Sequence, residues 1–185
     1  LLRRPAPAPR GRGVVTGDGA RAEWPRHRAA VRALLVDPED GAVLLLHSRF
    51  PGWKRSRWLV PGGGIDARET PLDALVREVR EETGRTIDRR AVAPTPVWYR
   101  RVRYAWQGVH YDQEEHFFLV PTLRFEPDTA NNPATHETEA LLGFDWWTPQ
   151  AMADSQEQFI PRALAGALAA LHRGGRPTTP IDVGP

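Results

Sequence analysis

A glycine turn that leads into an acidic helix is the feature that most constrains this chain. Residues 61–64 contain three consecutive glycines after a proline, and we call them the glycine turn. Thr70 is a good N-cap residue, Pro71 suits the first helical position, and Asp73 has the spacing of a capping box. Gly84 supplies a stop. The sequence therefore predicts a helix from Pro71 to the residue before Gly84.

This predicted helix has an apolar stripe beside a group of acids. The stripe follows the i, i+3, i+4, i+7 pattern of a helix face that packs on a core, and it consists of Leu72, Leu75, Val76 and Val79. Glu78, Glu81 and Glu82 share a neighbouring face, where like charges at this spacing repel one another. Clustered carboxylates suit a hard divalent cation such as Mg²⁺. The alternative is a charged face that is simply solvated.

The spacing of residues in this stretch resembles the signature of the Nudix hydrolases. The matching positions are Gly63, Glu69, Arg77, Glu78, Val79, Glu81, Glu82 and Gly84. Two positions depart from the family pattern, because Arg85 stands where an aliphatic residue is usual and Arg68 replaces a common glycine. The resemblance implies an α/β fold: a Nudix-type α/β/α sandwich with a mixed central sheet, in which the catalytic helix follows the glycine turn.

The same resemblance implies a metal site. Glu78, Glu81 and Glu82 match the family's metal-binding glutamates, and a carbonyl oxygen of Gly62 or Gly63 completes the set of ligands. Glycine suits that position because its backbone can approach a cation closely. The implied cofactor is Mg²⁺, with Mn²⁺ as a substitute. Glu78 is also our first choice as the general base.

Other catalytic positions follow from the resemblance as well. Arg77 matches the arginine that orients a glutamate, and Glu69 is its expected partner, while Gly84 has a structural role in the signature. The general base often comes from outside the signature in this family. The acids that qualify here are Glu114, Glu115, Glu137 and Glu139. Glu137 and Glu139 are most similar to the distal position of the family, and we assign the catalytic role to Glu139.

Length and composition bound the remaining interpretation. A chain of 185 residues fits one domain with tails, and the absence of cysteine excludes disulfides and thiolate metal sites. We expect a basic, proline-rich flexible arm over residues 1–23, a Nudix domain over 24–172 and a flexible tail over 173–185. The arm's arginines could contact nucleic acid or an acidic partner, but we favour a solvated tail. No run approaches about 18 apolar residues, so we expect no membrane contact and a cytoplasmic protein.

Hydrophobic runs predict the strands around the helix. Residues 29–36 and 42–46 read as strands joined by a tight turn, 58–61 as a short strand, and 97–104 with 109–120 as a hairpin. Trp146 and Trp147 read as the last strand. A final helix opens at Pro161 and directs three leucines to the core, namely Leu164, Leu168 and Leu171.

Four residues are candidates for substrate binding, each with a plainer alternative. Arg49 follows a strand where family members often carry a basic residue, although surface solubility accounts for it equally well. Trp58 has the chemistry to stack on a nucleobase, but a tryptophan beside a buried strand is more often part of the core. Arg101 and Arg103 share one face of a strand and suit phosphate, yet a half-buried sheet with a wet face gives the same alternation.

The resemblance implies hydrolysis of a nucleoside diphosphate linked to another moiety, so the expected partner is a small nucleotide-type molecule. The alternative is a module of the same fold that senses a nucleotide with little turnover. Sequence features of the ADP-ribose, coenzyme A and dinucleoside polyphosphate enzymes do not fit; Arg100, for example, stands at the proline position of the first group. A nucleoside triphosphate, oxidised or not, is the default substrate. A homodimer is left open.

Overall fold

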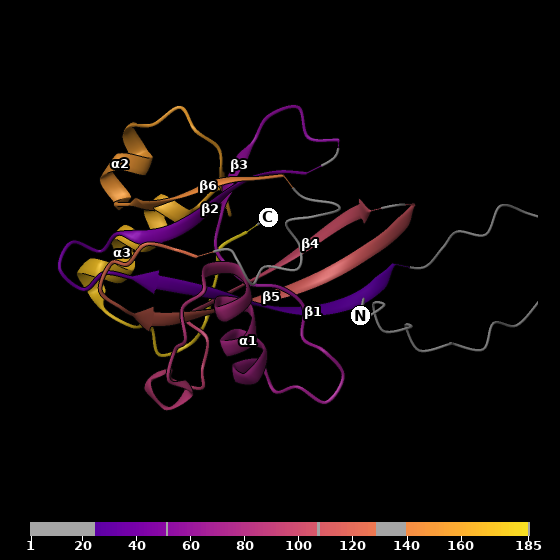
Figure 1. Cartoon of the computed structure of the whole chain (residues 1–185), viewed down its shortest axis with the longest axis horizontal. Helices are drawn as coiled ribbons and strands as arrows, with labels where there is room; N and C mark the ends of the chain where they lie inside the picture. Colours follow the sequence, from indigo (N-terminus) through magenta and orange to yellow (C-terminus); the bar gives the residue numbers. More distant parts are fainter. Residues whose placement is uncertain (1–24, 51, 107, 129–139, 185) are drawn as a thin grey trace, which may run out of the picture.

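The computed structural model describes residues 25–50, 52–106, 108–128 and 140–184, so the predicted arm lies outside the described residues. Figure 1 shows the arrangement of the elements. In chain order these are β1 (Arg26–Val36), β2 (Val43–Arg49), β3 (Arg57–Leu59), α1 (Pro71–Thr83), the 3₁₀ turn η1 (Arg89–Ala91), β4 (Trp98–Trp106), β5 (Val109–Pro121), β6 (Ala140–Trp147), α2 (Pro149–Asp154), β7 (Phe159–Ile160), α3 (Leu164–Gly174) and β8 (Ile181–Asp182).

The strands form one mixed sheet. Its order is β7-β3-β2-β1-β5-β4-β8, and β6 pairs with β2. β1 runs parallel to β5 over its whole length, whereas β4 and β5 form the predicted antiparallel hairpin. The register of β1 with β2 contains the pair Val36↔Val43 at their shared turn. The two strands diverge beyond that pair, which leaves one edge of β1 open to another segment.

The glycine turn occupies this open edge. The backbone N–H of Val31 donates to the Gly63 carbonyl at 2.9 Å, and that of Ala33 donates to the Pro61 carbonyl at 2.8 Å. Glycine is required for this close approach, because a Cβ at Gly62 would lie 2.2 Å from the Val31 carbonyl oxygen. The sheet therefore fixes the turn beside residues 77–82 of α1.

Helices cover both faces of the sheet because side chains alternate along β1 and β5. Leu35 and Phe118 pack with Leu75 of α1 in one apolar core. Their neighbours Leu34 and Phe117 point to the opposite face and pack with the helices α2 and α3. The predicted α/β/α sandwich is confirmed, and the leucines of the last helix face the core as predicted.

The C-terminal end differs from the prediction. Helix α3 continues to Gly174, and Ile181 and Asp182 then pair with β4 as strand β8. Val183 is only 6% exposed and belongs to the core on the α2/α3 face. The prediction of a flexible tail is therefore wrong for this segment, because Ile181 and Asp182 pair with the open edge of β4. For the same reason the tryptophan strand, β6, is not the last one.

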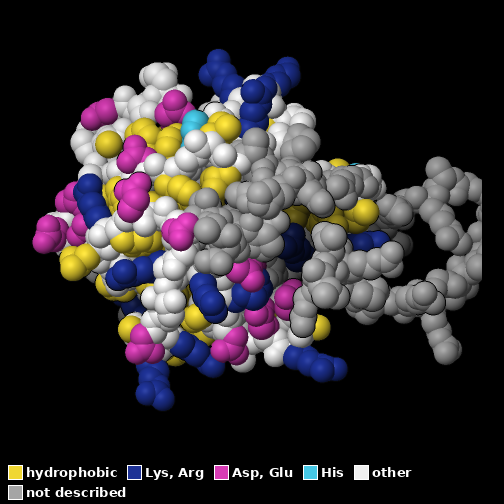
Figure 2. Space-filling model, in the orientation of Figure 1, with side chains coloured by type: hydrophobic (Ala, Val, Ile, Leu, Met, Phe, Trp, Pro, Cys, Tyr) yellow, Lys and Arg dark blue, Asp and Glu magenta, His cyan; other side chains and the backbone are white. Residues whose placement is uncertain are grey.

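No helix within the described ranges is long and apolar enough to cross a membrane. On the face shown in Figure 2, acidic and basic side chains lie next to each other over the region of α1, so the surface there is not of a single charge.

Candidate active site

Helix α1 begins and ends as local sequence rules dictate. The Thr70 hydroxyl oxygen accepts a hydrogen bond from the Asp73 backbone N–H, and the Asp73 carboxylate accepts one from the Thr70 N–H, so the capping box is complete. Gly84 closes the helix in the left-handed conformation with φ 71°. These caps determine where α1 starts and ends, and so they determine which turn of the helix carries each acid.

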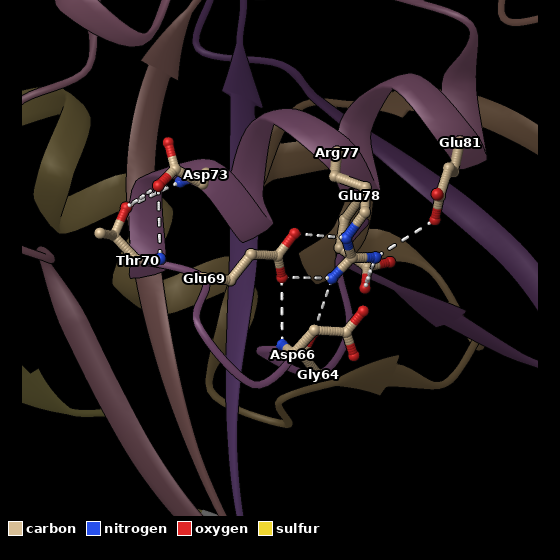
Figure 3. A network of polar contacts seen from close by, with 8 residues as sticks. All are labelled: Gly64, Asp66, Glu69, Thr70, Asp73, Arg77, Glu78 and Glu81. Atoms are coloured by element: carbon tan, nitrogen blue, oxygen red, sulfur yellow. Dashed lines mark hydrogen bonds and ion pairs between the residues drawn. The ribbon is translucent and has the colours of Figure 1, made fainter. Parts of the chain in front are cut away.

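Arg77 is the hub of the polar network in Figure 3. Its Nε and Nη2 atoms donate to the two carboxylate oxygens of Glu69 at 2.7 and 2.9 Å, so the expected partner is present. Nη2 also donates to the Gly64 carbonyl at 2.9 Å, which ties the helix to the glycine turn. Nη1 donates to Glu78 at 2.8 Å and to Glu81 at 3.2 Å. The hydrogen bonds from Arg77 lower the pKa of Glu69.

Glu78 and Glu82, one helical turn apart, both lie against the glycine turn. A Cβ added at Gly63 would come within 2.5 Å of a Glu78 carboxylate oxygen. The Gly62 backbone N–H donates to Glu82 Oε2 at 2.6 Å. The Glu78 side chain is 13% exposed, and its burial raises its pKa although Arg77 opposes the shift. Because Arg77 compensates only partly for the burial of this carboxylate, a nearby cation would stabilise its charged form.

Glu81 lies differently from the other two candidate metal ligands. Its carboxylate binds Arg77, and no group of three acidic or imidazole side chains within the described residues is close enough to hold an ion. Glu78 and Glu82 therefore contact the turn, whereas Glu81 is held on the outer side of the arginine. The atoms of these acids and of the turn's carbonyl groups that could bind a metal are all oxygens, and oxygen is the ligand that Mg²⁺ prefers.

The distal acids are in three situations. Glu137 and Glu139 lie outside the described residues. Glu114 has a 56% exposed side chain on the α1 face of β5 and pairs with His116 at 2.7 Å. Glu115 points to the other face, where Arg32 and Arg100 bind it. Burial alone would raise the pKa of Glu115, but these two guanidiniums lower it to about 2, so Glu115 is a poor proton acceptor.

Arg32 contacts the site and was not singled out from the sequence. Its guanidinium Nη1 donates to the carbonyl oxygens of Gly62 and, at 3.4 Å, of Val60, while Nη2 binds Glu115 at 2.6 Å. A signal was available: Arg32 is a single charge inside an apolar β-strand run, and a buried charge needs a partner. Nothing in the sequence indicates which acid that partner is.

Of the weaker substrate candidates, Trp58 is buried. Its ring stacks on His47 with centroids 4.4 Å apart and meets Trp147 edge-on at 5.2 Å. The structure therefore favours the core alternative, and the ring does not present a face to a nucleobase. Arg49 ends β2 with an exposed side chain.

Arg101 and Arg103 share one face of β4, as predicted. Both approach Asp112 on β5, at 2.6 and 3.6 Å respectively. They lie on the α1 face of the sheet, opposite Arg100. Within the described residues, the ion-pair contacts of these two arginines are with Asp112 and not with the glycine turn.

Comparison with known proteins identifies the family. A family model described as NUDIX domain matches residues 26–165, which is more than half of the chain. The chain belongs to the Nudix family of hydrolases. The match lies within the Nudix domain predicted for residues 24–172 and includes the glycine turn and all of α1. The family resemblance stated from the sequence is confirmed, and so is the prediction that the protein is an enzyme of this hydrolase family.

Two relatives named as hydrolases match parts of the chain. An RNA pyrophosphohydrolase of Ruthia magnifica subsp. Calyptogena magnifica is 31% identical over 123 residues, which cover 62% of this chain and 67% of that protein. A putative 8-oxo-dGTP diphosphatase 3 of Mycobacterium tuberculosis (strain ATCC 25618 / H37Rv) is 39% identical over 89 residues, 47% of this chain and 41% of that protein. The chain thus spans less than half of the second relative.

The fold is that of solved Nudix structures. The crystal structure of a MutT Nudix hydrolase from Burkholderia pseudomallei superposes with a TM-score of 0.53 at 24% identity, covering 78% of this chain and 97% of that one. At this identity the likeness concerns the fold alone. It agrees with the sandwich of α1, the mixed sheet and the pair α2 and α3.

Proposed function

We propose that this Nudix protein is a Mg²⁺-dependent pyrophosphohydrolase, which cleaves a phosphoric anhydride bond of a nucleoside diphosphate linked to another moiety. The observation that carries the proposal is the placement of Glu78 and Glu82 against Gly62 and Gly63. The names of the two relatives support it, because both denote hydrolases of a diphosphate or pyrophosphate group.

The residues present fit a hard divalent cation. Glu78, Glu82 and a carbonyl of Gly62 or Gly63 would hold Mg²⁺ or Mn²⁺. The two carbonyls also accept hydrogen bonds from Arg32 and Val31, respectively. Glu81 would join the ligands by exchanging its contact with Arg77. When bound, the cation supplies charge neutralisation on the phosphates and makes a water molecule easier to deprotonate. The raised pKa of Glu78 in the unloaded protein agrees with a buried anion that such a cation would stabilise.

The protein's own side chains would then have separate tasks. Glu78 would accept the proton of the attacking water at a carboxylate oxygen. Arg77 holds Glu78 in place from one side, while its bidentate contact with Glu69 fixes the guanidinium. Glu139 remains our proposal for the distal acid, on a segment outside the described residues.

A nucleoside triphosphate, oxidised or not, is the substrate we propose, by elimination of the other classes and by the name of the mycobacterial relative. A nucleotide-sensing module with little turnover is the second candidate. It is favoured by one observation, the engagement of Glu81 with Arg77 rather than with the other acids.

The test is a panel of canonical nucleoside triphosphates, 8-oxo-dGTP and 5′-triphosphorylated RNA, assayed with Mg²⁺ for released phosphate and pyrophosphate. We expect hydrolysis of at least one compound, and its loss in Glu82→Gln. Glu157→Gln is the matched control, because Glu157 is an exposed acid between α2 and β7 that is not a candidate for catalysis. Binding of a nucleotide without release of phosphate would favour the sensing module. Equal rates for Glu82→Gln and the wild type would overturn the proposed site.

A further inference from the structure

A continuous chain of contacts leads from the glycine turn into the sheet. Arg32 donates through Nη1 to the Gly62 carbonyl, and through Nε and Nη2 to Glu115 Oε1 at 3.1 and 2.6 Å. Arg100 Nε binds the other oxygen, Oε2. Gln113 adds a hydrogen bond to Oε1 at 2.7 Å. The four side chains lie on the α2/α3 face of β1, β4 and β5.

These charges are buried, which makes their geometry well defined. The Glu115 side chain is 1% exposed, that of Arg100 is 9% and that of Arg32 is 17%. A buried ion pair adds little net stability over an apolar alternative, because desolvation offsets the attraction. Its partners are nevertheless held in one arrangement, since moving either would leave an uncompensated charge. The role of this ion pair therefore lies in what Arg32 holds in place.

What Arg32 holds is the peptide group between Gly62 and Gly63. Glu82 binds the N–H on the other side of Gly62 at 2.6 Å. Gly62 has φ 134°, a conformation with no side chain of its own to restrain it. The two peptide groups that flank Gly62 are thus each fixed by a different charged residue, one from β1 and one from α1.

We propose that Arg32, held by Glu115, is a positioning residue for the glycine turn. It sets the orientation of the Gly62 carbonyl and so the distance of the turn from Glu78 and Glu82. Glu115 acts through Arg32 and exchanges no proton with substrate. The inference rests on the proposed function only in that the turn belongs to the active site.

The chain contains a matched control for this pair. Asp112 lies three residues before Glu115 on β5, is similarly buried, and binds Arg101 through two contacts of 2.6 Å. This second pair points to the α1 face. None of its described contacts involves the glycine turn. A substitution that only destabilises the sheet should have a similar effect at either pair. A loss of positioning should follow substitution of Arg32 or Glu115 and not substitution in the second pair.

The first measurement is hydrogen–deuterium exchange by mass spectrometry over residues 60–66, in the full chain without metal or substrate. Arg32→Gln and Glu115→Gln are expected to exchange about tenfold faster or more in this segment, the effect of losing a charge-assisted hydrogen bond. Arg101→Gln should exchange there like the wild type. Unchanged exchange in Arg32→Gln would overturn the inference.

The second measurement separates kcat from KM on the substrate found in the panel. Arg32→Gln should lower kcat by about tenfold or more and leave KM within about threefold, because a misplaced turn weakens the transition state more than binding. Arg32→Lys keeps a cation next to Glu115 and should recover part of kcat. Asp112→Asn breaks the second pair at a residue that is not a substrate candidate. Equal, small losses of kcat in Arg32→Gln and Asp112→Asn would assign both pairs to stability alone.

Two complications are resolved by this design. If Arg32→Gln does not fold, Arg32→Lys takes its place, because a lysine cannot reproduce the fork that reaches Glu115 and Gly62 together. Its turn must then exchange faster than that of Arg101→Gln, or the inference fails. If the wild type hydrolyses no compound of the panel, the proposed function fails, and the exchange measurement still decides on Arg32.

Discussion

The first turn of α1 and its middle both carry acidic side chains, but in opposite electrostatic settings. At the first turn, Asp73 is solvent-accessible, and the hydrogen bond from the Thr70 hydroxyl lowers its pKa. Further along the helix, Glu78 is largely buried against the glycine turn, and that burial raises its pKa. Asp73 stabilises the start of the helix, because a negative charge is favourable at a helix N-terminus. Glu78 is held in a site that disfavours its charge until something compensates for it.

The difference shows where function resides on this helix. The contacts of Asp73 come from Thr70 and Arg89, so they depend on nearby chain and can be lost without changing the turn. The contacts of Glu78 depend on Gly63 and Arg77. Substitution of Glu78 should therefore mainly lower activity, whereas substitution of Asp73 should mainly lower stability.

Glu78→Gln should have the largest effect of any substitution on α1. Removing the proton acceptor should lower kcat by about 10²–10⁴-fold, the usual contribution of a general base. The fold should persist, because the amide is isosteric and no longer carries a buried charge. Steady-state rates and a thermal melt measure the two quantities. Asp73→Asn in the first turn is the control, and a comparable loss of kcat in both variants would contradict the contrast between them.

Gly63→Ala tests whether the turn and Glu78 are matched in shape. The added methyl would meet the carboxylate at 2.5 Å and displace it, so we expect kcat to fall by about 10²-fold, as for a misplacement of about 1 Å. Gly166→Ala on the exposed side of α3 is the control, because a Cβ there meets nothing within 4 Å. It should stabilise the protein by about 0.8–1 kcal/mol. Wild-type kcat in Gly63→Ala would show that Glu78 need not sit against the turn.

Glu115 sharpens the comparison, because it is more deeply buried than Glu78 and yet its pKa is lowered to about 2 by Arg32 and Arg100. A depressed folded-state pKa means that the unfolded state binds the proton more tightly. The contribution of Glu115 to stability is thus fully present above its ordinary pKa of 4.5 and is lost as pH falls towards 2. Urea unfolding between pH 5 and about 2.5 should show a steeper decline for the wild type than for Glu115→Gln. Parallel declines would mean that Glu115 is not ionised by its two partners.

The sequence predicts the first end of α1 almost completely, because capping depends on residues within one turn of each other. Thr70, Pro71, Asp73 and Gly84 all occupy the expected positions. The pairing of Arg77 with Glu69 was also accessible, since the spacing of the family signature implies it. What lies within about a helix length of the signature could be predicted.

The contacts around the turn could not be predicted in the same way. Arg32 and Glu115 are 83 residues apart and meet only because β1 and β5 pair in parallel. Periodicity gives a strand its faces but not its neighbour in the sheet. The same limit explains β8: the segment after Arg173 reads as a polar tail until the free edge of β4 is known. Glu81 was grouped with the other acids by helical spacing, and its binding to Arg77 depends on side-chain geometry.

Thr70→Ala should have the smallest effect and is the clearest test of the first end. The substitution removes the oxygen that accepts the Asp73 N–H, at a cost of about 1 kcal/mol in the free energy of unfolding. Because Glu78, Glu82 and the glycine turn keep their contacts, kcat should stay within about twofold of the wild type. Urea unfolding and steady-state rates on the same preparation measure both. A tenfold loss of kcat would show that the cap positions the acids as well as starting the helix, so the first turn of α1 would be coupled to the active site after all.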